Sequence, residues 1–206
     1  GPCSEIFFDN GQKLQGGLPG TKNEDGERFV EIWNLVFMEY KKLNGKLNKL
    51  PNKCVDTGMG LERITAVLAK KSNNFDTDLF DYLFKEIEAI LNIRYDSRLQ
   101  SSFKIISDHI RAIVFLISEG ILPSNEGRGY VLRRIIRRAL MHVHKIKPNT
   151  IMLNNLVDIV VEKYSDVYFE IKKSSSFIKK NLKNEEDKFS ETLETGINLL
   201  KKEISE

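Results

Sequence analysis

The spacing of hydrophobic and polar residues predicts strands in the first quarter of the chain. Residues 3–9 and 29–40 are rich in Ile, Phe, Val and Trp, a composition typical of β-strands. The pair Asn44-Gly45 predicts a tight hairpin turn, with residues 46–50 as the returning strand. This part of the chain is therefore expected to form strands joined by at least one hairpin.

The next segment changes from strand to helix within a few residues. Residues 54–60 predict a short strand that runs directly into a helix, which begins near Leu61 and ends near Lys70. Two asparagines then interrupt the pattern, so residues 72–78 are the expected domain boundary.

From Asp78 onward the apolar residues recur at helical intervals. Between Ile106 and Ile117 the isoleucines are spaced by 4, 3 and 4 residues. Further helices are predicted at 153–167 and at roughly 175–204, the last with only a thin apolar stripe. The whole pattern predicts an α+β chain whose strands precede an all-helical region.

Composition narrows the class of protein. The chain has 206 residues, 41% hydrophobic and 30% charged, enough for one large or two modest domains. No apolar run approaches the ~20 residues of a membrane span, and no secretory leader opens the chain, so a cytoplasmic protein without a membrane partner is expected. Cys3 and Cys54 predict no disulfide framework, and no zinc site is expected because no histidine stands at ligand spacing from a cysteine. His142 and His144 would point to different faces of a helix.

Positive charge is concentrated in one segment. The net charge is only +3, but residues 103–147 hold nine Lys/Arg against three acids, which makes this segment +6 and the remainder −3. From about residue 129 the apolar side chains of a helix fall within one arc of about 140°. Four arginines occupy the opposite arc, with no acid on this helix at i±3 or i±4: Arg133, Arg134, Arg137 and Arg138. Four guanidinium groups facing solvent predict an RNA-backbone partner, and a solvated face paired to local glutamates is the alternative.

A glycine-containing motif at residues 56–64 suits a nucleotide site. Gly58 and Gly60 lack a Cβ, so the chain can turn or approach a ligand closely there. The planar guanidinium of Arg63 can stack on a purine or fork onto phosphate oxygens. Taken alone this spacing is weak, because short glycine spacings also mark ordinary turns.

Together with residues 123–140, this motif resembles the alanyl-tRNA synthetase family, a branch of the class II aminoacyl-tRNA synthetases. The two stretches stand in the family's order and at about its spacing. Further matching stretches, which extend the resemblance over almost the whole chain, are residues 1–9, 31–38, 108–112 and 189–200.

The resemblance implies a fold and an activity. Residues 1–75 would be the C-terminal part of a class II antiparallel-sheet catalytic domain, including the third class II motif, and residues 76–206 a helical domain that recognises the tRNA acceptor stem. The implied enzyme is an ATP-dependent, AMP-forming alanine–tRNA ligase, which forms alanyl-adenylate and transfers alanine to the 3′ end of tRNA(Ala). The first two class II motifs lie outside this stretch, so by itself it is expected to be inactive. The alternative is a non-catalytic tRNA- or RNA-binding module derived from a synthetase.

The resemblance also assigns substrate contacts. Asp56 would bind the amino group of alanine, with a helix N-cap as the alternative role. Asn34 would lie beside the bound alanine, or would simply be a hydrogen-bonded amide in the strand.

ATP would be held by Gly58, Gly60 and Arg63, although Arg63 could instead be a surface arginine paired to Glu62 or Glu39. Mg²⁺ accompanies ATP, and Glu5 and Glu31 are equal candidates as its ligands.

For tRNA, the candidate contacts are Asn125, Arg128 and the four helical arginines. The chain departs from the family pattern at Gly127, where some alanyl-tRNA synthetases carry an asparagine next to the identity G·U pair. A glycine offers no side-chain amide, so base reading would need backbone or other residues.

Overall fold

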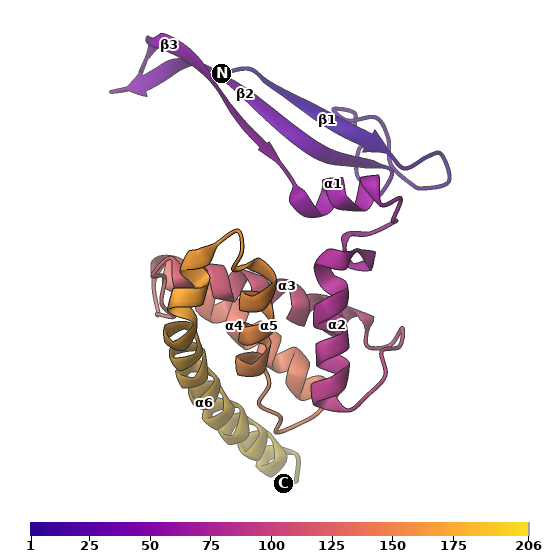
Figure 1. Cartoon of the computed structure of the whole chain (residues 1–206), viewed down its shortest axis with the longest axis vertical. Coiled ribbons are helices and arrows are strands. Elements are labelled where there is room, and N and C mark those ends of the chain that lie inside the picture. Colours follow the sequence, from indigo (N-terminus) through magenta and orange to yellow (C-terminus); the bar gives the residue numbers. More distant parts are fainter. Residues whose placement is uncertain (206) are drawn as a thin grey trace. The chain divides into compact units, whose positions relative to one another are not determined.

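Three strands of the first unit form an antiparallel sheet. The computed structural model of the protein describes residues 1–205 and contains β1 (Cys3–Asp9), β2 (Phe29–Leu43) and β3 (Lys46–Met59), in the order β1-β2-β3 (Figure 1). Asn44 and Gly45 both have positive φ, of 50° and 79°, which is the backbone of the predicted two-residue hairpin turn. The α+β prediction is confirmed.

β3 is longer than predicted. The sequence predicted separate strands at 46–50 and 54–60, but the structure has one continuous strand, which includes Pro51. β3 lies at the edge of the sheet, where a proline costs no inner hydrogen bond. The register to β2 also shifts between Met38 and Tyr40, opposite this segment, so the irregularity is absorbed locally.

The sheet continues into a short helix. α1 (Leu61–Leu68) begins directly after β3 and contacts β2. It is followed by η1 (Asn74–Asp76), a short 3₁₀ helix in which the side chain of Asn73 accepts a hydrogen bond from the N–H of Phe75. The chain divides between Leu79 and Phe80 into two compact units, here called the sheet unit and the helical unit.

Within residues 1–205 the helical unit contains five α-helices around one hydrophobic core: α2 (Asp78–Leu91), α3 (Gln100–Ser118), α4 (Gly127–Ile146), α5 (Leu153–Tyr164) and α6 (Phe169–Ser205). α3 packs against α4, α5 and α6, and the four isoleucines at the predicted helical intervals are buried: Ile106, Ile110, Ile113 and Ile117. α6 begins six residues before the predicted start near 175. No helix within residues 1–205 is both long and apolar enough to cross a lipid bilayer.

Candidate functional site

One face of the sheet brings together several predicted substrate contacts. Asn34 of β2 lies directly between Glu5 of β1 and Gly58 of β3 in the strand register, and directly opposed residues share a face. Asp56 precedes Gly58 by two residues and lies on the same face, opposite Val36. We call the set of Glu5, Asn34, Asp56 and Gly58 the sheet face.

Hydrogen bonds fix Asn34 in place. Its Nδ2 donates to Oε1 of Glu5 at 3.2 Å, so the partner expected for a half-buried amide is a neighbouring carboxylate. Its backbone oxygen accepts from Oγ1 of Thr57 at 3.1 Å, and that hydroxyl accepts from the indole N–H of Trp33. The strand is therefore held from both sides while the amide stays on the sheet face.

Asp56 lies in β3 and is exposed, which excludes the helix-cap alternative. The N-cap of α1 is Gly60, and no side chain caps that helix. An exposed carboxylate in the middle of a strand has no role in starting α1. Its charge is available to a ligand over the sheet face.

Gly58 does not form a turn. Its φ is not among the positive values of the chain, and it pairs with Asn34 in extended conformation. A Cβ added at Gly58 would meet no atom within 4 Å, so neither backbone strain nor packing requires glycine there. Gly60 is likewise extended, and a Cβ on it would only touch the stem of Arg63 at 3.4 Å. The turn alternative is therefore excluded for both glycines, and close approach of a ligand at Gly58 stays a prediction.

Arg63 reaches back from α1 to the neighbouring strand. Its Nη1 donates to the backbone oxygen of Glu31 at 2.8 Å and lies 3.8 Å from the carboxylate of the same residue. Glu39, one of the expected partners, instead binds Lys53 at 3.0 Å. The Arg63 side chain remains 49% exposed, so its guanidinium is held in position and still accessible.

The acidic residues of this region do not form a metal cage by themselves. Within the described residues there is no group of three or more His, Cys, Asp or Glu side chains that could hold a metal ion. Mg²⁺ commonly takes only one or two protein carboxylates and completes its shell with phosphates and water. Glu5 lies on the sheet face and the Glu31 carboxylate lies 3.8 Å from Arg63, and both stay predictions as single-carboxylate ligands of Mg²⁺. Cys3 and Cys54 are free and exposed.

The four arginines of α4 do not all face solvent, which corrects the sequence prediction. Arg137 Nε lies 2.7 Å and Arg133 Nε 3.2 Å from Oε1 of Glu185, a residue of α6 that is only 3% exposed. Arg133 also donates to Oδ1 of Asn125, and to the backbone oxygen of Pro123 at 3.5 Å. Arg133 and Arg137, the inner arginines, therefore tie α4 to α6 and to the preceding loop.

The outer arginines, Arg134 and Arg138, are exposed as predicted. Arg134 lies over the ring of Tyr130, with its guanidinium carbon 5.8 Å from the ring centroid. Arg128, in the first turn of α4, is also exposed. The exposed arginines of α4 are thus Arg128, Arg134 and Arg138.

Sequence reasoning missed Glu185, although a signal for it existed. The apolar stripe of α6 runs from Ile178 to Leu182 and then skips to Phe189. A seven-residue gap is two helical turns, so the missing position on the buried side falls at Glu185 or Glu186. Both are buried in the structure. A carboxylate on the apolar side of α6 indicates a cationic partner on another helix, and the arginines of α4 supply it.

Two glycines shape the start of α4. Gly127 has φ +56°, a left-handed conformation open to glycine and, among other residues, most readily to asparagine. This backbone requirement suits the asparagine of some alanyl-tRNA synthetases as well as the glycine here. At Gly129 a Cβ would lie 2.3 Å from the backbone oxygen of Leu122, so the loop can pack against α4 only because this residue is glycine.

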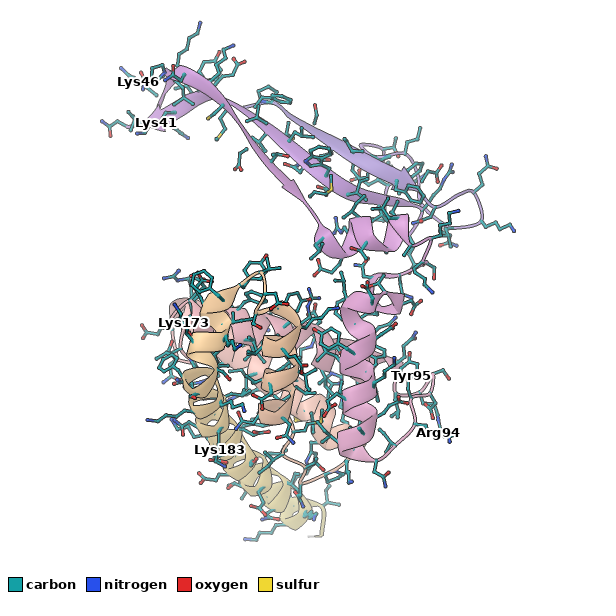
Figure 2. The ribbon with its side chains drawn as sticks, in the orientation of Figure 1. Lys41, Lys46, Arg94, Tyr95, Lys173 and Lys183 are labelled. Atoms are coloured by element: carbon teal, nitrogen blue, oxygen red, sulfur yellow. The ribbon has the colours of Figure 1, made fainter. Side chains whose placement is uncertain are left out.

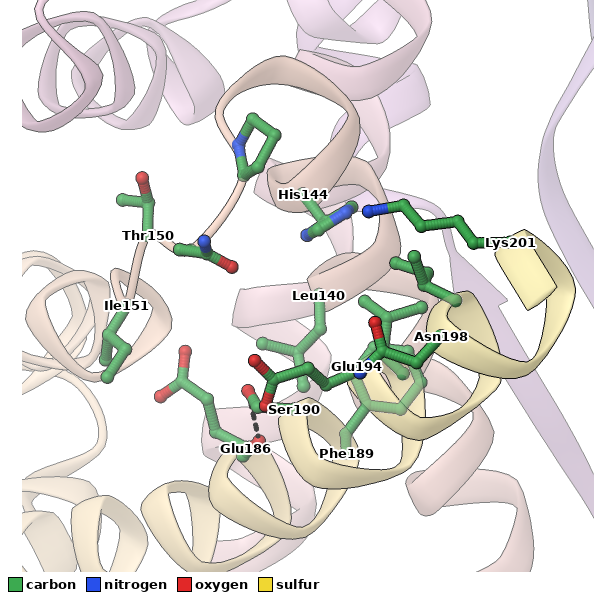
Figure 3. A pocket seen from close by; sticks show the side chains of 14 residues that line it. Leu140, His144, Thr150, Ile151, Glu186, Phe189, Ser190, Glu194, Asn198 and Lys201 are labelled. Carbon is green, nitrogen blue, oxygen red and sulfur yellow. Dashed lines mark hydrogen bonds between the residues drawn. The ribbon is translucent and has the colours of Figure 1, made fainter. Parts of the chain in front are cut away.

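A cavity of about 510 Å³ lies in the helical unit between α4, α6 and the loop before α5 (Figure 3). Glu186 lines it and is 2% exposed. Burial raises the pKa of Glu186 to about 7, while the N–H groups of Met152 and Leu153 at the start of α5 act in the opposite direction. The carboxylate thus lies at the positive end of α5. His144 also lines the cavity, whereas His142 bonds Ser102, so the two histidines have different surroundings, as predicted.

The family model described as "tRNA synthetases class II (A)" matches residues 1–206, and the chain belongs to this family. The alanine–tRNA ligase of Rickettsia akari (strain Hartford) is 50% identical over 204 residues, which cover 98% of this chain and 23% of that protein. Those of Rickettsia prowazekii (strain Madrid E) and Rickettsia felis (strain ATCC VR-1525 / URRWXCal2) are 50% and 49% identical over the same lengths. The chain therefore spans about a quarter of the length of the curated relatives it matches.

Proposed function

We propose that this chain is part of an alanine–tRNA ligase that activates alanine with ATP and transfers it to tRNA(Ala) in the cytoplasm. The sheet unit would carry substrate contacts for activation, and the helical unit would bind the tRNA acceptor stem. The similarity to proteins named alanine–tRNA ligase supports the reaction, and the placement of charged side chains supports the division of labour.

On the sheet face, activation requires little covalent chemistry from the protein. The alanine carboxylate attacks the α-phosphate of ATP and pyrophosphate leaves, so positioning and charge stabilisation dominate. Asp56 would bind the substrate ammonium, and Asn34, fixed by Glu5, would orient it. The nucleotide would lie over Gly58 and Gly60 and contact Arg63. Mg²⁺ held by Glu5 or Glu31 would neutralise phosphate charge when bound.

The single observation that carries the sheet-face assignment is Gly58. Its backbone is extended and the space above it is open, so the fold tolerates a side chain there. A glycine that the fold does not need, beside a fixed amide and an exposed carboxylate, is explained by a ligand that lies against the strand.

For tRNA, the outer arginines and Arg128 would contact the backbone of the acceptor stem. Exposed guanidinium groups on one helix repel each other, and phosphates relieve that repulsion. The inner arginines would act indirectly, because their ion pairs with Glu185 hold α4 against α6. Asn125, held by Arg133, is the amide nearest to Gly127 in the sequence and the candidate for a base or ribose contact.

The reaction is tested by ATP–pyrophosphate exchange with the full-length protein. We expect exchange that depends on alanine and not on the other amino acids. Binding of tRNA without amino-acid-dependent exchange would contradict the ligase proposal and favour a non-catalytic RNA-binding module.

The RNA surface is tested by the R134A/R138A variant of the same protein. For every arginine that binds a phosphate, its removal should flatten the slope of log affinity for tRNA against log salt by about 0.7–0.9. Alanine activation and stability should be unchanged, because both side chains are exposed. K85A/R94A removes the same charge from the helical unit at positions outside α4 and is the matched control. Equal salt dependence of all three proteins would refute the role of the outer arginines.

A further inference from the structure

The tip of the β2–β3 hairpin carries a second concentration of positive charge. Four lysines stand within ten residues of each other, and no acidic residue occurs between Tyr40 and Val55. Figure 2 shows two of them, Lys41 and Lys46, projecting into solvent from the end of the hairpin. All four are exposed: Lys41, Lys42, Lys46 and Lys49.

These lysines have no anionic partner within residues 1–205. Among the ion pairs of that part of the chain, the one nearest the tip joins Lys53 to Glu39, and none involves the four lysines. Neighbouring strands are only about 5 Å apart, well within the ~10 Å screening length of a 0.1 M salt solution. The four ammonium groups therefore repel one another, and an anionic partner would relieve that repulsion.

The strand register distributes the lysines over both faces of the hairpin. Lys42 lies opposite Leu47, and Tyr40 lies opposite Lys49. These four residues share one face because residues two apart on a strand point the same way. The other face consists of Lys41, Leu43, Lys46 and Asn48, paired as Lys41 with Asn48 and Leu43 with Lys46.

The distribution of lysines over both faces distinguishes a polyanion from a lipid bilayer as the anionic partner. A segment that lies in a membrane surface separates an apolar face from a charged one. Here the exposed leucines are on opposite faces, Leu43 at 49% and Leu47 at 70% exposure, and each face also carries two lysines. A ribbon that is cationic on both sides fits a groove or bend of a polyanion better than the plane of a lipid bilayer.

We propose that the β2–β3 hairpin tip binds the phosphate backbone of RNA, as a contact separate from the α4 arginines. The proposal rests on the proposed function, which supplies tRNA as the RNA. Lysine is a flexible point charge, so this contact would add affinity without reading sequence. Tyr40, on the face that carries Lys42 and Lys49, offers an aromatic ring to an unpaired base or ribose.

The test uses the full-length protein and measures tRNA affinity across a salt series. The hairpin variant K41Q/K42Q/K46Q/K49Q should flatten the slope of log affinity against log salt by about 0.7–0.9 for each lysine that contacts phosphate, or about 2.8–3.6 if all four do. The matched control removes four exposed lysines from other parts of the sheet unit, as K13Q/K22Q/K70Q/K71Q. Both variants should keep the wild-type melting temperature, since none of the eight side chains is buried.

A flattened slope for the hairpin variant and a wild-type slope for the control supports the hairpin contact. Equal flattening by both variants means a net-charge effect and overturns it. A wild-type slope for the hairpin variant also overturns it, and if R134A/R138A still flattens the slope, the proposed function stands. If both the hairpin variant and R134A/R138A keep the wild-type slope, the proposal that this chain binds tRNA is contradicted as well.

Two further arms locate the partner. K42Q/K49Q and K41Q/K46Q divide the lysines by face, and a larger slope change for the first would place the RNA against the side of Tyr40. Vesicles of 70% phosphatidylcholine and 30% phosphatidylserine, a composition of about physiological charge, test the lipid alternative. Loss of vesicle binding by the hairpin variant, with tRNA binding unchanged, would overturn the RNA proposal in favour of a membrane surface.

Discussion

The two units place their charged residues in opposite environments. In the helical unit Glu185 and Glu186 are buried, at 3% and 2% exposure, and lie between helices. In the sheet unit Asp56 and the hairpin lysines are exposed and outside the ion pairs found within residues 1–205. Buried charges need partners and therefore report on the fold, whereas exposed charges without partners are free to bind ligands. Removing one of these buried carboxylates of the helical unit should thus cost stability, whereas removing one of these exposed charges of the sheet unit should cost binding or chemistry.

The largest expected effect is that of Glu185→Ala. This change leaves the two inner arginines facing an apolar helix contact without their shared carboxylate, and breaking such a pair costs about 3–5 kcal/mol when both groups are buried. The arginines are only partly buried, with side chains 19% and 34% exposed, so we expect a value near the lower end of that range. Denaturant unfolding of the 206-residue chain measures it. Glu191→Ala, at an exposed position of α6, is the control and should change stability by less than about 0.5 kcal/mol. Equal stabilities would show that the inner arginines do not hold α4 to α6.

A smaller, pH-dependent effect is expected from Glu186. The pKa of this carboxyl is about 7 in the folded protein against an ordinary value of 4.5, so the folded state holds the proton more tightly than the unfolded state. Its contribution to stability is therefore present in full below about pH 4.5 and is lost as pH rises through 7. The loss is at most about 3 kcal/mol.

The Glu186→Gln variant isolates this contribution, because glutamine has the shape of the protonated acid and does not titrate. We expect the free energy of unfolding to fall more steeply from about pH 5 to about pH 8 in the wild type than in Glu186→Gln. Parallel pH profiles would mean that Glu186 is solvated or paired in solution, and would remove it from the set of buried charges.

Periodicity predicted the helical unit well because its contacts follow local spacing. Ile106, Ile110 and Ile117 are buried as their intervals indicate, and the arc from Leu132 to Val143 packs on the core. Gly120, with φ +81°, follows the C-cap of α3, a position where helices commonly carry glycine. These features depend on residues within a few positions of each other, which a sequence displays directly.

Features that depend on distant residues were not predictable in the same way. The pairing of Arg133 and Arg137 with Glu185 joins positions about fifty residues apart, and a helical wheel of α4 alone placed both arginines in solvent. The role of Gly58 was open between a turn and a ligand approach, and only the strand register to Asn34 removed the turn. The contribution of Asp56 and the other substrate contacts remains a prediction from the family resemblance.

The central claim is that the sheet face activates alanine, and Asp56→Asn in the full-length protein tests it most directly. Asparagine keeps the shape of the side chain and removes the charge that would face the substrate ammonium. Loss of a charged hydrogen bond is worth about 1.5–3 kcal/mol, so we expect alanine-dependent ATP–pyrophosphate exchange to fall about 10- to 150-fold. Stability should change by less than about 0.5 kcal/mol, since Asp56 is exposed and caps no helix. Wild-type exchange accompanied by lower stability would contradict the account, because it would make Asp56 a structural residue.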